Sequence, residues 1–258
     1  MAPAAAVLAA VLALVVWAAL LAANQAWAGP PFFTDDPEPV PYRHAEFYVA
    51  SQYAQDPGGR SGTAPHFEAN YGAAPELQLH ALLPLAWDRP EGEDTAYGLG
   101  DLELGAKYRF LREGAWRPQA GVFPLVLLPT GDEDQGLGNG RVQVFLPLWL
   151  QKSWDAWTTY GGGGYRINPG DGNQNSVFVG WLLQRDLTDW LTLGGELYYA
   201  SADTQDGRDS TGYNLGAIIN LTEEHHILLS AGRDLRGDTD LQFYVAYQFT
   251  FGPLGGPR

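Results

Sequence analysis

Apolar and polar residues alternate along most of this chain with a period of two. Between Asp101 and Phe110 the even-numbered residues are apolar or aromatic, whereas the odd-numbered residues are charged or glycine. The same alternation runs from Leu241 to Phe251, with the apolar residues at odd positions. A period of two is that of a β-strand with one apolar and one polar face. No helix-length amphipathic segment stands out after residue 28, so the pattern predicts an all-β fold.

Breaks rich in Gly, Pro and Asp separate the alternating segments and differ in length in a regular order. The long, polar breaks are residues 54–63, 88–95, 130–140, 168–175, 202–210 and 234–240. The short turns between them are residues 72–76, 111–115, 153–156, 186–189 and 222–225. Six long breaks alternating with five short turns divide the chain into twelve strands.

An even number of strands, with long loops at one end and short turns at the other, is typical of bacterial outer-membrane barrels. Closure of the sheet also satisfies the backbone polar groups that lipid cannot. We therefore predict an all-β fold that is a closed antiparallel transmembrane β-barrel of about twelve strands. The alternative is a soluble exported β-sandwich, which accounts for the aromatic composition but not for the alternating loop lengths.

Aromatic residues lie next to the breaks, where a barrel meets the two membrane interfaces. Tyr53, Tyr97, Tyr199 and Tyr213 lie near the long breaks. The residues that we assign as interfacial aromatics are Trp87, Trp116, Trp154, Trp157 and Trp190.

The first residues predict export. Residues 2–23 are uncharged and almost entirely Ala, Val and Leu, and Ala26-Trp27-Ala28 matches the small-x-small site of signal peptidase. We expect a signal peptide over residues 1–28, with an uncleaved anchor helix as the alternative. Residues 29–42 then form an extended N-terminal periplasmic segment, either an extended tail or a plug in the periplasmic mouth, of which we favour the tail. The barrel follows over residues 43–251 and a short tail over residues 252–258.

Charge and composition exclude several classes of function. The net charge is −15 and no basic stripe is present, which argues against a nucleic-acid partner. The absence of cysteine excludes disulfides and thiolate metal sites. Many of the acidic residues fall in the long breaks, where they either concentrate cations, bind divalent ions that bridge lipopolysaccharide phosphates, or simply solvate the loops.

No motif predicts catalysis. None of the five histidines has a serine two residues later, as the resident outer-membrane phospholipases require, and G-x-S-x-G and H-E-x-x-H are absent. Residues 171–182 begin like a calcium loop but lack its glycine and its final acid. We therefore expect no enzyme activity, no metal and no cofactor.

The inward face of the predicted barrel carries charged and aromatic residues together. A barrel of about twelve strands is narrower than a porin, so side chains fill part of its lumen. Charged residues inside line a water path or form a salt-bridge network. The residues that we predict to line the pore are Glu46, Glu68, His80, Asp101, Glu103, Lys107, Arg109, Arg141, Gln143, Trp149, Glu196, Tyr244 and Gln248.

Several short motifs resemble those of a known family. They are Thr34-Asp35-Asp36-Pro37-Glu38-Pro39, Asn70-Tyr71-Gly72, Lys107-Tyr108-Arg109-Phe110, Leu128-Pro129-Thr130-Gly131 and Gly138-Asn139-Gly140. The chain resembles a bacterial family of outer-membrane transporters labelled after the meta-pathway of phenol degradation. The resemblance implies a channel-like outer-membrane barrel for small solutes, aromatic or amphipathic compounds among them. Its motifs specify the barrel better than the solute.

The leading hypothesis is a passive outer-membrane transporter or channel. Its partners would be outer-membrane lipid and lipopolysaccharide, a small-molecule solute and the barrel-assembly machinery. Two alternatives stay open: a closed structural or adhesion barrel that acts through its acidic external loops, and a membrane-embedded hydrolase.

Overall fold

The computed structural model describes residues 31–253. The signal peptide expected over residues 1–28 therefore lies outside the described residues. Within them the chain forms fourteen strands and one short 3-10 helix. The strands are β1 (Ala45–Asp56), β2 (Gly59–Ala74), β3 (Leu77–Pro90), β4 (Ala96–Leu99), β5 (Leu102–Leu111), β6 (Gln119–Val122), β7 (Leu125–Leu128), β8 (Gln143–Trp154), β9 (Trp157–Ile167), β10 (Ser176–Thr188), β11 (Leu191–Ala200), β12 (Ser210–Asn220), β13 (His225–Arg236) and β14 (Leu241–Phe251). The 3-10 helix is η1 (Glu133–Gln135), and no helix of this part of the chain is long and apolar enough to cross a membrane.

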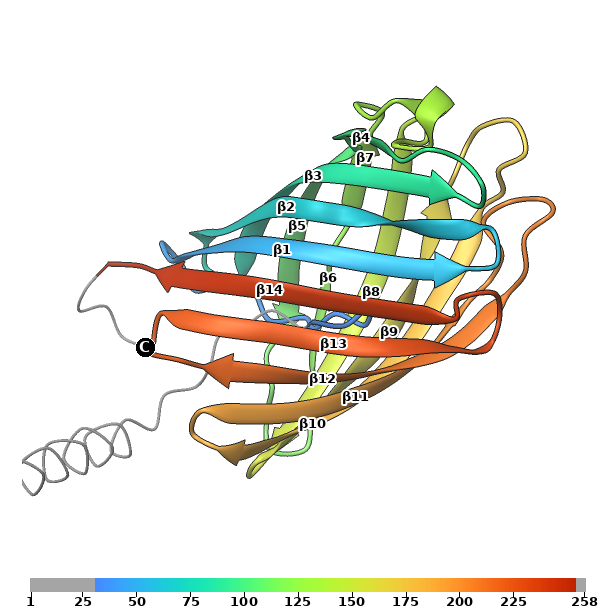
Figure 1. Cartoon of the computed structure of the whole chain (residues 1–258). Coiled ribbons are helices and arrows are strands. Elements are labelled where there is room, and N and C mark those ends of the chain that lie inside the picture. Colours follow the sequence, from blue (N-terminus) through green and yellow to red (C-terminus); the bar gives the residue numbers. More distant parts are fainter. Residues whose placement is uncertain (1–30, 254–258) are drawn as a thin grey trace, which may run out of the picture.

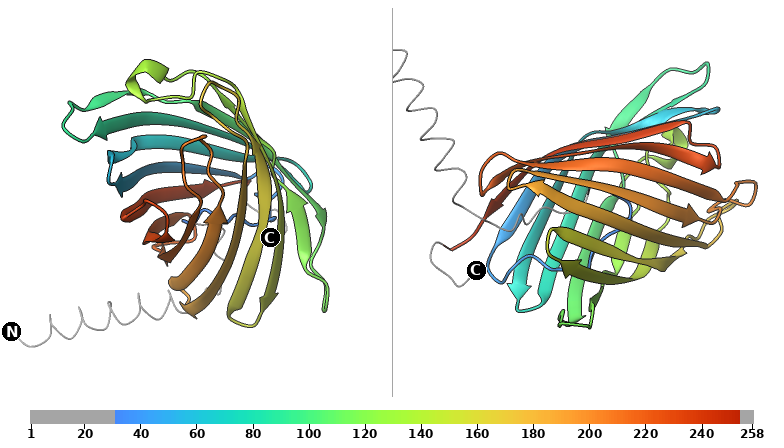
Figure 2. Two further views of the ribbon diagram at one scale, coloured as in Figure 1. Left: turned by 90° about the vertical axis from the view of Figure 1, so that its right-hand side faces the viewer. Right: turned by 90° about the horizontal axis from the view of Figure 1, so that it is seen from below.

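The strands form one closed antiparallel barrel (Figures 1 and 2). The first and last strands pair along nearly their whole length, from Ala45 opposite Phe251 to Gln55 opposite Leu241, and this pairing seals the cylinder. Because β4 and β5 occupy one position in the wall, and β6 and β7 another, the barrel has twelve positions. The prediction of a closed barrel of about twelve strands is confirmed, and closure rules out the β-sandwich.

Two of the twelve positions are interrupted for local chemical reasons. The first break is at Gly100 and Asp101, where the Gly100 N–H turns to the carbonyl of Pro84 at 3.0 Å. The second is at Phe123 and Pro124, where proline has no N–H to donate to the sheet. Both breaks lie in the same part of the wall, between β3 and β8.

The connections follow the predicted alternation only in part. The turn expected at residues 111–115 is a seven-residue connection between β5 and β6, and the long break expected at residues 234–240 is a four-residue connection, as short as that between β12 and β13. Long connections follow β7, β9 and β11, and two-residue turns join β2 to β3, β8 to β9 and β10 to β11. The long break expected over residues 54–63 is wrong, because β1 and β2 continue through it and Asp56 pairs with Gly59. Pro57 and Gly58 suit a two-residue turn, and the polar residues beside them belong to strand.

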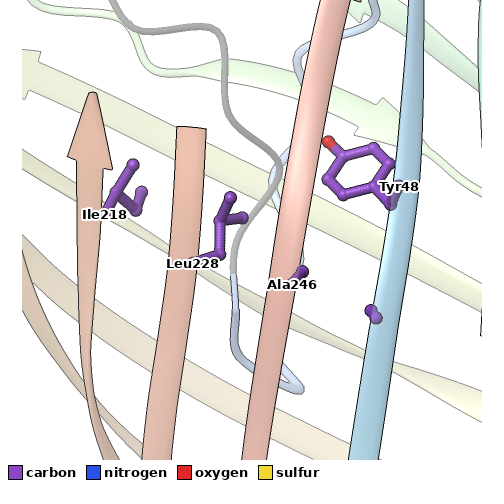
Figure 3. Packing of buried hydrophobic residues seen from close by; sticks show 5 residues of the cluster. Tyr48, Ile218, Leu228 and Ala246 are labelled. Atoms are coloured by element: carbon purple, nitrogen blue, oxygen red, sulfur yellow. The ribbon is translucent and has the colours of Figure 1, made fainter. Parts of the chain in front are cut away.

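The two faces of the wall have opposite character. Along β8, Leu146, Leu148 and Leu150 are exposed on the outside, whereas Phe145 and Trp149, at alternate positions of the same strand, are buried inside. Some apolar side chains also pack on the inner face: Tyr48, Ala50, Ile218, Leu228 and Ala246 form a cluster across β12, β13, β14 and β1 (Figure 3). The interior is therefore polar with apolar patches, and the exterior is an apolar surface that suits lipid.

The predicted interfacial tryptophans lie near the ends of the barrel wall. Trp116, in the connection between β5 and β6, is 97% exposed, and Trp154 and Trp190 are exposed beside the two-residue turns. Trp157 is half-buried under the guanidinium of Arg185, at 5.1 Å from its ring centroid. At the other end Trp87 packs on Tyr53, with ring centroids 5.9 Å apart. Contact of these residues with the membrane interface stays a prediction.

The position of an outward residue along its strand decides how much a charge there destabilises the protein. Leu215, which is 64% exposed in the middle of β12, lies where lipid would be most apolar. We expect Leu215→Arg to lower the free energy of unfolding in lipid vesicles by about 2–4 kcal/mol. The measurement is urea unfolding of the refolded protein.

The matched control is Leu235→Arg, near the end of β13, where the neighbours Arg233 and Arg236 are already exposed. This change should cost about 0–1 kcal/mol. Equal costs for the two variants would mean that no apolar layer surrounds the middle of the barrel.

Candidate functional site: the barrel lumen

Residues 31–42, here called the lumen segment, lie inside the barrel and cross it before β1 begins (Figures 1 and 2). Its side chains or backbone bind β13, β11, β5, β6, β3 and β2. The expectation of an extended tail is therefore wrong for these residues. The reason is chemical: the segment is rich in carboxylates and unpaired backbone N–H groups, and the inner wall offers a partner for many of them.

The first contact of the lumen segment is with Glu196 on β11. The carboxylate of Glu196 accepts the backbone N–H of Phe33 at 2.9 Å and that of Thr34 at 2.8 Å. The amide of Asn214 on β12 donates a further hydrogen bond to Glu196 at 2.6 Å. The Glu196 residue is only 2% exposed, so these donors replace the water that its charge would otherwise bind.

The second contact is an ion pair on the opposite side of the lumen. Lys107 of β5, 5% exposed, places its Nζ 2.9 Å from the carboxylate of Asp35 and 3.6 Å from that of Asp36. The same ammonium lies 5.1 Å from the ring centroid of Phe123. A buried lysine without these carboxylates would be strongly destabilising, so the segment and the wall depend on each other here.

A third set of contacts holds the segment near the end of the barrel where β1 begins. Arg109 donates to Glu38 at 3.2 Å and to Glu76 at 2.5 Å, and Arg112 also pairs with Glu76. Glu76 lies in the turn between β2 and β3. Burial alone would raise the pKa of Glu76, but the hydrogen bonds from Arg109 and Arg112 outweigh it and hold that pKa below its usual value. The Val40 N–H then donates to Gln78 at 2.9 Å.

A cavity of about 1120 Å³ remains between the lumen segment and the wall. It begins at the turns after β8 and β10 and extends toward the other end of the barrel, to residues near the end of β1 and the start of β2. Its lining is strongly acidic, with Lys107 and Arg109 as the basic residues apart from two histidines. The acidic residues of the lining are Asp35, Asp36, Glu38, Glu46, Glu68, Glu103, Glu113, Asp155, Asp186 and Asp189.

A hydrogen-bonded cluster on β1, β2, β3 and β5 forms one wall of this cavity. His80 Nε2 lies 3.1 Å from the carboxylate of Glu103, and its Nδ1 lies 2.8 Å from the amide oxygen of Asn70. Asn70 in turn donates to Glu68 at 2.8 Å. Nearby, the Tyr48 hydroxyl donates to Glu46 at 2.7 Å. Within residues 31–253 no group of three or more His, Asp and Glu is arranged to hold a metal ion.

The structure places most of the predicted pore-lining residues on the inner wall. Those that line the cavity are Glu46, Glu68, His80, Glu103, Lys107, Arg109 and Tyr244. Those that are buried on the inner wall but outside the cavity are Gln143, Trp149, Glu196 and Gln248. Whether these residues contact a passing solute stays a prediction.

Two predicted pore-lining residues are placed elsewhere, and both lie at strand ends. Asp101 occupies the break between β4 and β5, and its carboxylate accepts the backbone N–H of Gly131 at 3.0 Å and of Asn139 at 2.8 Å. It therefore holds the connection between β7 and β8 in place. Arg141 precedes β8, is exposed, and bonds the carbonyl of the adjacent Gly140. The strand alternation that assigned both residues to the lumen does not extend to them.

Sequence patterns missed the polar amides that receive the lumen segment. Gln78 and Gln119 are buried on the inner wall and bind Val40 and Glu38. Their inward positions in alternating strands were a signal that the sequence offered. No such signal pointed to their binding partner, because the lumen segment has no periodicity.

A family model described as “Putative MetA-pathway of phenol degradation” matches residues 61–251 of this chain. No curated protein matches it.

Solved structures share the fold. The COG4313 outer membrane channel from Pseudomonas putida F1 is 19% identical, with a TM-score of 0.71, over 84% of this chain and 98% of that chain. The KdgM porin in complex with disordered oligogalacturonate is 10% identical, with a TM-score of 0.54, over 81% of this chain and 99% of that chain. The NanC porin is 7% identical, with a TM-score of 0.53, over 81% of this chain and 100% of that chain. At these identities the likeness is one of fold.

The hydrogen bonds of Glu196 make a testable contribution to holding the lumen segment. We expect Glu196→Ala to speed amide hydrogen exchange at Phe33 and Thr34 by roughly tenfold to a hundredfold, because hydrogen bonds to a charged group are lost. The measurement is hydrogen exchange followed by mass spectrometry. Glu93→Ala, in the exposed turn between β3 and β4, is the control and should leave these amides unchanged. Unchanged exchange in Glu196→Ala would show that other contacts hold the segment.

Proposed function

We propose a function from the premise that this chain belongs to the family described as “Putative MetA-pathway of phenol degradation”. The protein is a bacterial outer-membrane channel for small solutes, and its own lumen segment keeps that channel closed. The observation that carries the proposal is the course of residues 31–42, which cross the lumen and bind opposite sides of its wall through Glu196 and Lys107.

The surroundings of the barrel follow from its two faces. The apolar exterior contacts outer-membrane lipid, and the acidic loops face lipopolysaccharide. The C-terminal strand ends on Phe249 and Phe251, an alternating aromatic ending that suits recognition by the barrel-assembly machinery. The role is passage of solutes rather than catalysis.

The acidic cavity supports a preference for cations over anions. Carboxylates in a narrow lumen with low-dielectric walls attract cations and repel anions. In the closed state Lys107 and Arg109 neutralise the carboxylates of the segment itself. The wall carboxylates Glu46, Glu68 and Glu103 remain in the cavity when the segment is displaced.

Deletion of residues 31–40 should open the channel. The barrel closes through its own strand pairs, so its wall persists while the lumen gains a continuous water path. We expect single-channel conductance in planar bilayers to rise by at least about tenfold over that of the full chain. A deletion of residues 204–207, in the exposed connection after β11, is the control and should leave conductance as in the full chain.

If the deleted protein runs as a folded, heat-modifiable barrel and still carries no current, the channel proposal fails. The closed structural barrel that acts through its loops would then be the better interpretation.

Neutralising a wall carboxylate should reduce selectivity in the opened channel. In the protein without residues 31–40, we expect Glu103→Gln to lower the cation-to-anion permeability ratio by about twofold, because one fixed charge of the lumen is lost. The measurement is the reversal potential across a salt gradient. Asp206→Asn, in the exposed connection between β11 and β12, is the matched control. The same permeability ratio in both variants would show that Glu103 does not line the path of the solute.

A further inference from the structure

Phe32 and Phe33 of the lumen segment bind a recess that is built into the inner wall of β10, β11 and β12. The carboxylate of Glu196 on β11 accepts two backbone N–H groups of the segment there, at 2.9 and 2.8 Å. Among residues 31–253 Glu196 forms no ion pair. Hydrogen-bond donors, rather than a cation, therefore compensate this buried charge.

One side of the recess is made of glycine. Gly194 and Gly216 are paired residues of β11 and β12. A Cβ atom added at Gly194 would lie 3.1 Å from Cζ of Phe32, and one added at Gly216 would lie 2.6 Å from the same atom. The tip of the Phe32 ring thus rests directly on backbone. Two adjacent glycines leave a flat space in which an aromatic ring fits and a side chain would not.

The other side of the recess is aromatic. The ring of Phe33 meets that of Tyr198 edge to face, with centroids 5.1 Å apart and planes at 73°. Tyr198 stacks on Phe178 at 6.3 Å, and Phe178 meets Trp149 at 6.3 Å. Phe33 nevertheless stays 49% exposed inside the barrel, where it faces the cavity. Because the Phe33 ring is half exposed to the lumen, its position depends on the contact with Tyr198 of the wall and not on burial of the ring.

We propose that this recess is a binding site for monocyclic aromatic compounds that carry hydroxyl or amino groups, and that Phe32 and Phe33 occupy it in the closed channel as an internal substitute for such a compound. The ring of the compound lies on the Gly194 and Gly216 backbone or against Tyr198, and its O–H or N–H groups donate to Glu196. Solute and lumen segment compete for the same wall. The inference rests on the proposed function and adds the class of solute that displaces the segment.

The recess excludes related compounds on simple grounds. An aromatic carboxylate brings a second negative charge to Glu196, which has no cation to offset it. A saturated ring diol supplies the donors but not the flat face. Benzoate and cyclohexane-1,2-diol are therefore the negative probes, and catechol (1,2-dihydroxybenzene) is the positive one.

The test removes the two rings of the lumen segment from the recess in the full-length chain. In Phe32→Ala/Phe33→Ala protein, we expect equilibrium dialysis in detergent to show catechol binding about tenfold tighter than in the unaltered protein, because the two competing rings are gone and only the backbone N–H groups of residues 33 and 34 still compete for Glu196. Benzoate and cyclohexane-1,2-diol should bind neither protein measurably. Catechol binding that is the same with and without the two phenylalanines, or equal binding of the three probes, would overturn the proposal.

Wall variants in the Phe32→Ala/Phe33→Ala background test the recess itself. Glu196→Gln should weaken catechol binding roughly tenfold, because a charged acceptor becomes a neutral one. Gly194→Val should abolish binding by filling the flat space. Gly195→Val, on the outward face of the same strand beside Leu215, is the matched control and should bind as before. Heat-modifiable migration in gels confirms that each variant is a folded barrel.

Failure here and failure of the channel proposal are separate results. Conductance after deletion of residues 31–40 is measured without any aromatic compound. If the deletion opens the channel but the open channel does not discriminate catechol from benzoate, the channel proposal stands and the proposed aromatic binding site is refuted. If the recess is correct, catechol added to the unaltered protein in bilayers should raise the frequency of openings, and benzoate at the same concentration should not.

Discussion

The structure depends on the pairing of backbone N–H and C=O groups around the full circle of the wall. In lipid an unpaired backbone group has no water to bind, so an open sheet edge is not tolerated. The pairing of β1 with β14, from Ala45 opposite Phe251 onward, removes the last two edges. Once the cylinder is closed, the alternation of side chains gives every second residue to lipid and the rest to the lumen. The separation of a lipid-facing set of side chains from a lumen-facing set thus follows from one constraint.

The interior then meets a second constraint, because charges in a narrow lumen need partners. Glu196 obtains backbone N–H donors from the lumen segment, and Lys107 obtains two of its carboxylates. The segment in turn obtains partners for its own polar groups along its course. Each of these groups would be costly to bury alone. The closed state is therefore a mutual neutralisation of wall and segment, which explains how a short, non-helical stretch without a core of its own has a defined path.

The sequence predicted what depends on local periodicity and missed what depends on distant contacts. Strand alternation placed Glu103 and Lys107 on the inner face, and the order of breaks predicted twelve positions. It failed at strand ends, where Asp101 binds a loop instead of the lumen. It also failed for residues 31–42, whose contacts with Lys107 and Glu196 join positions more than seventy residues apart. The acidic, proline-rich composition of that segment fits a tail and a plug equally well.

The pairing of the lumen segment with the wall has a consequence for how this sequence can diverge. Residues 31–42 have the composition of a linker, and linkers ordinarily accept substitutions and changes of length freely. Here Asp35 is matched to Lys107, Glu38 to Arg109, and Phe32 to Gly194. A replacement on either side therefore requires a compensating replacement on the other. Among homologues these pairs should covary, and the spacing between them should tolerate few insertions or deletions.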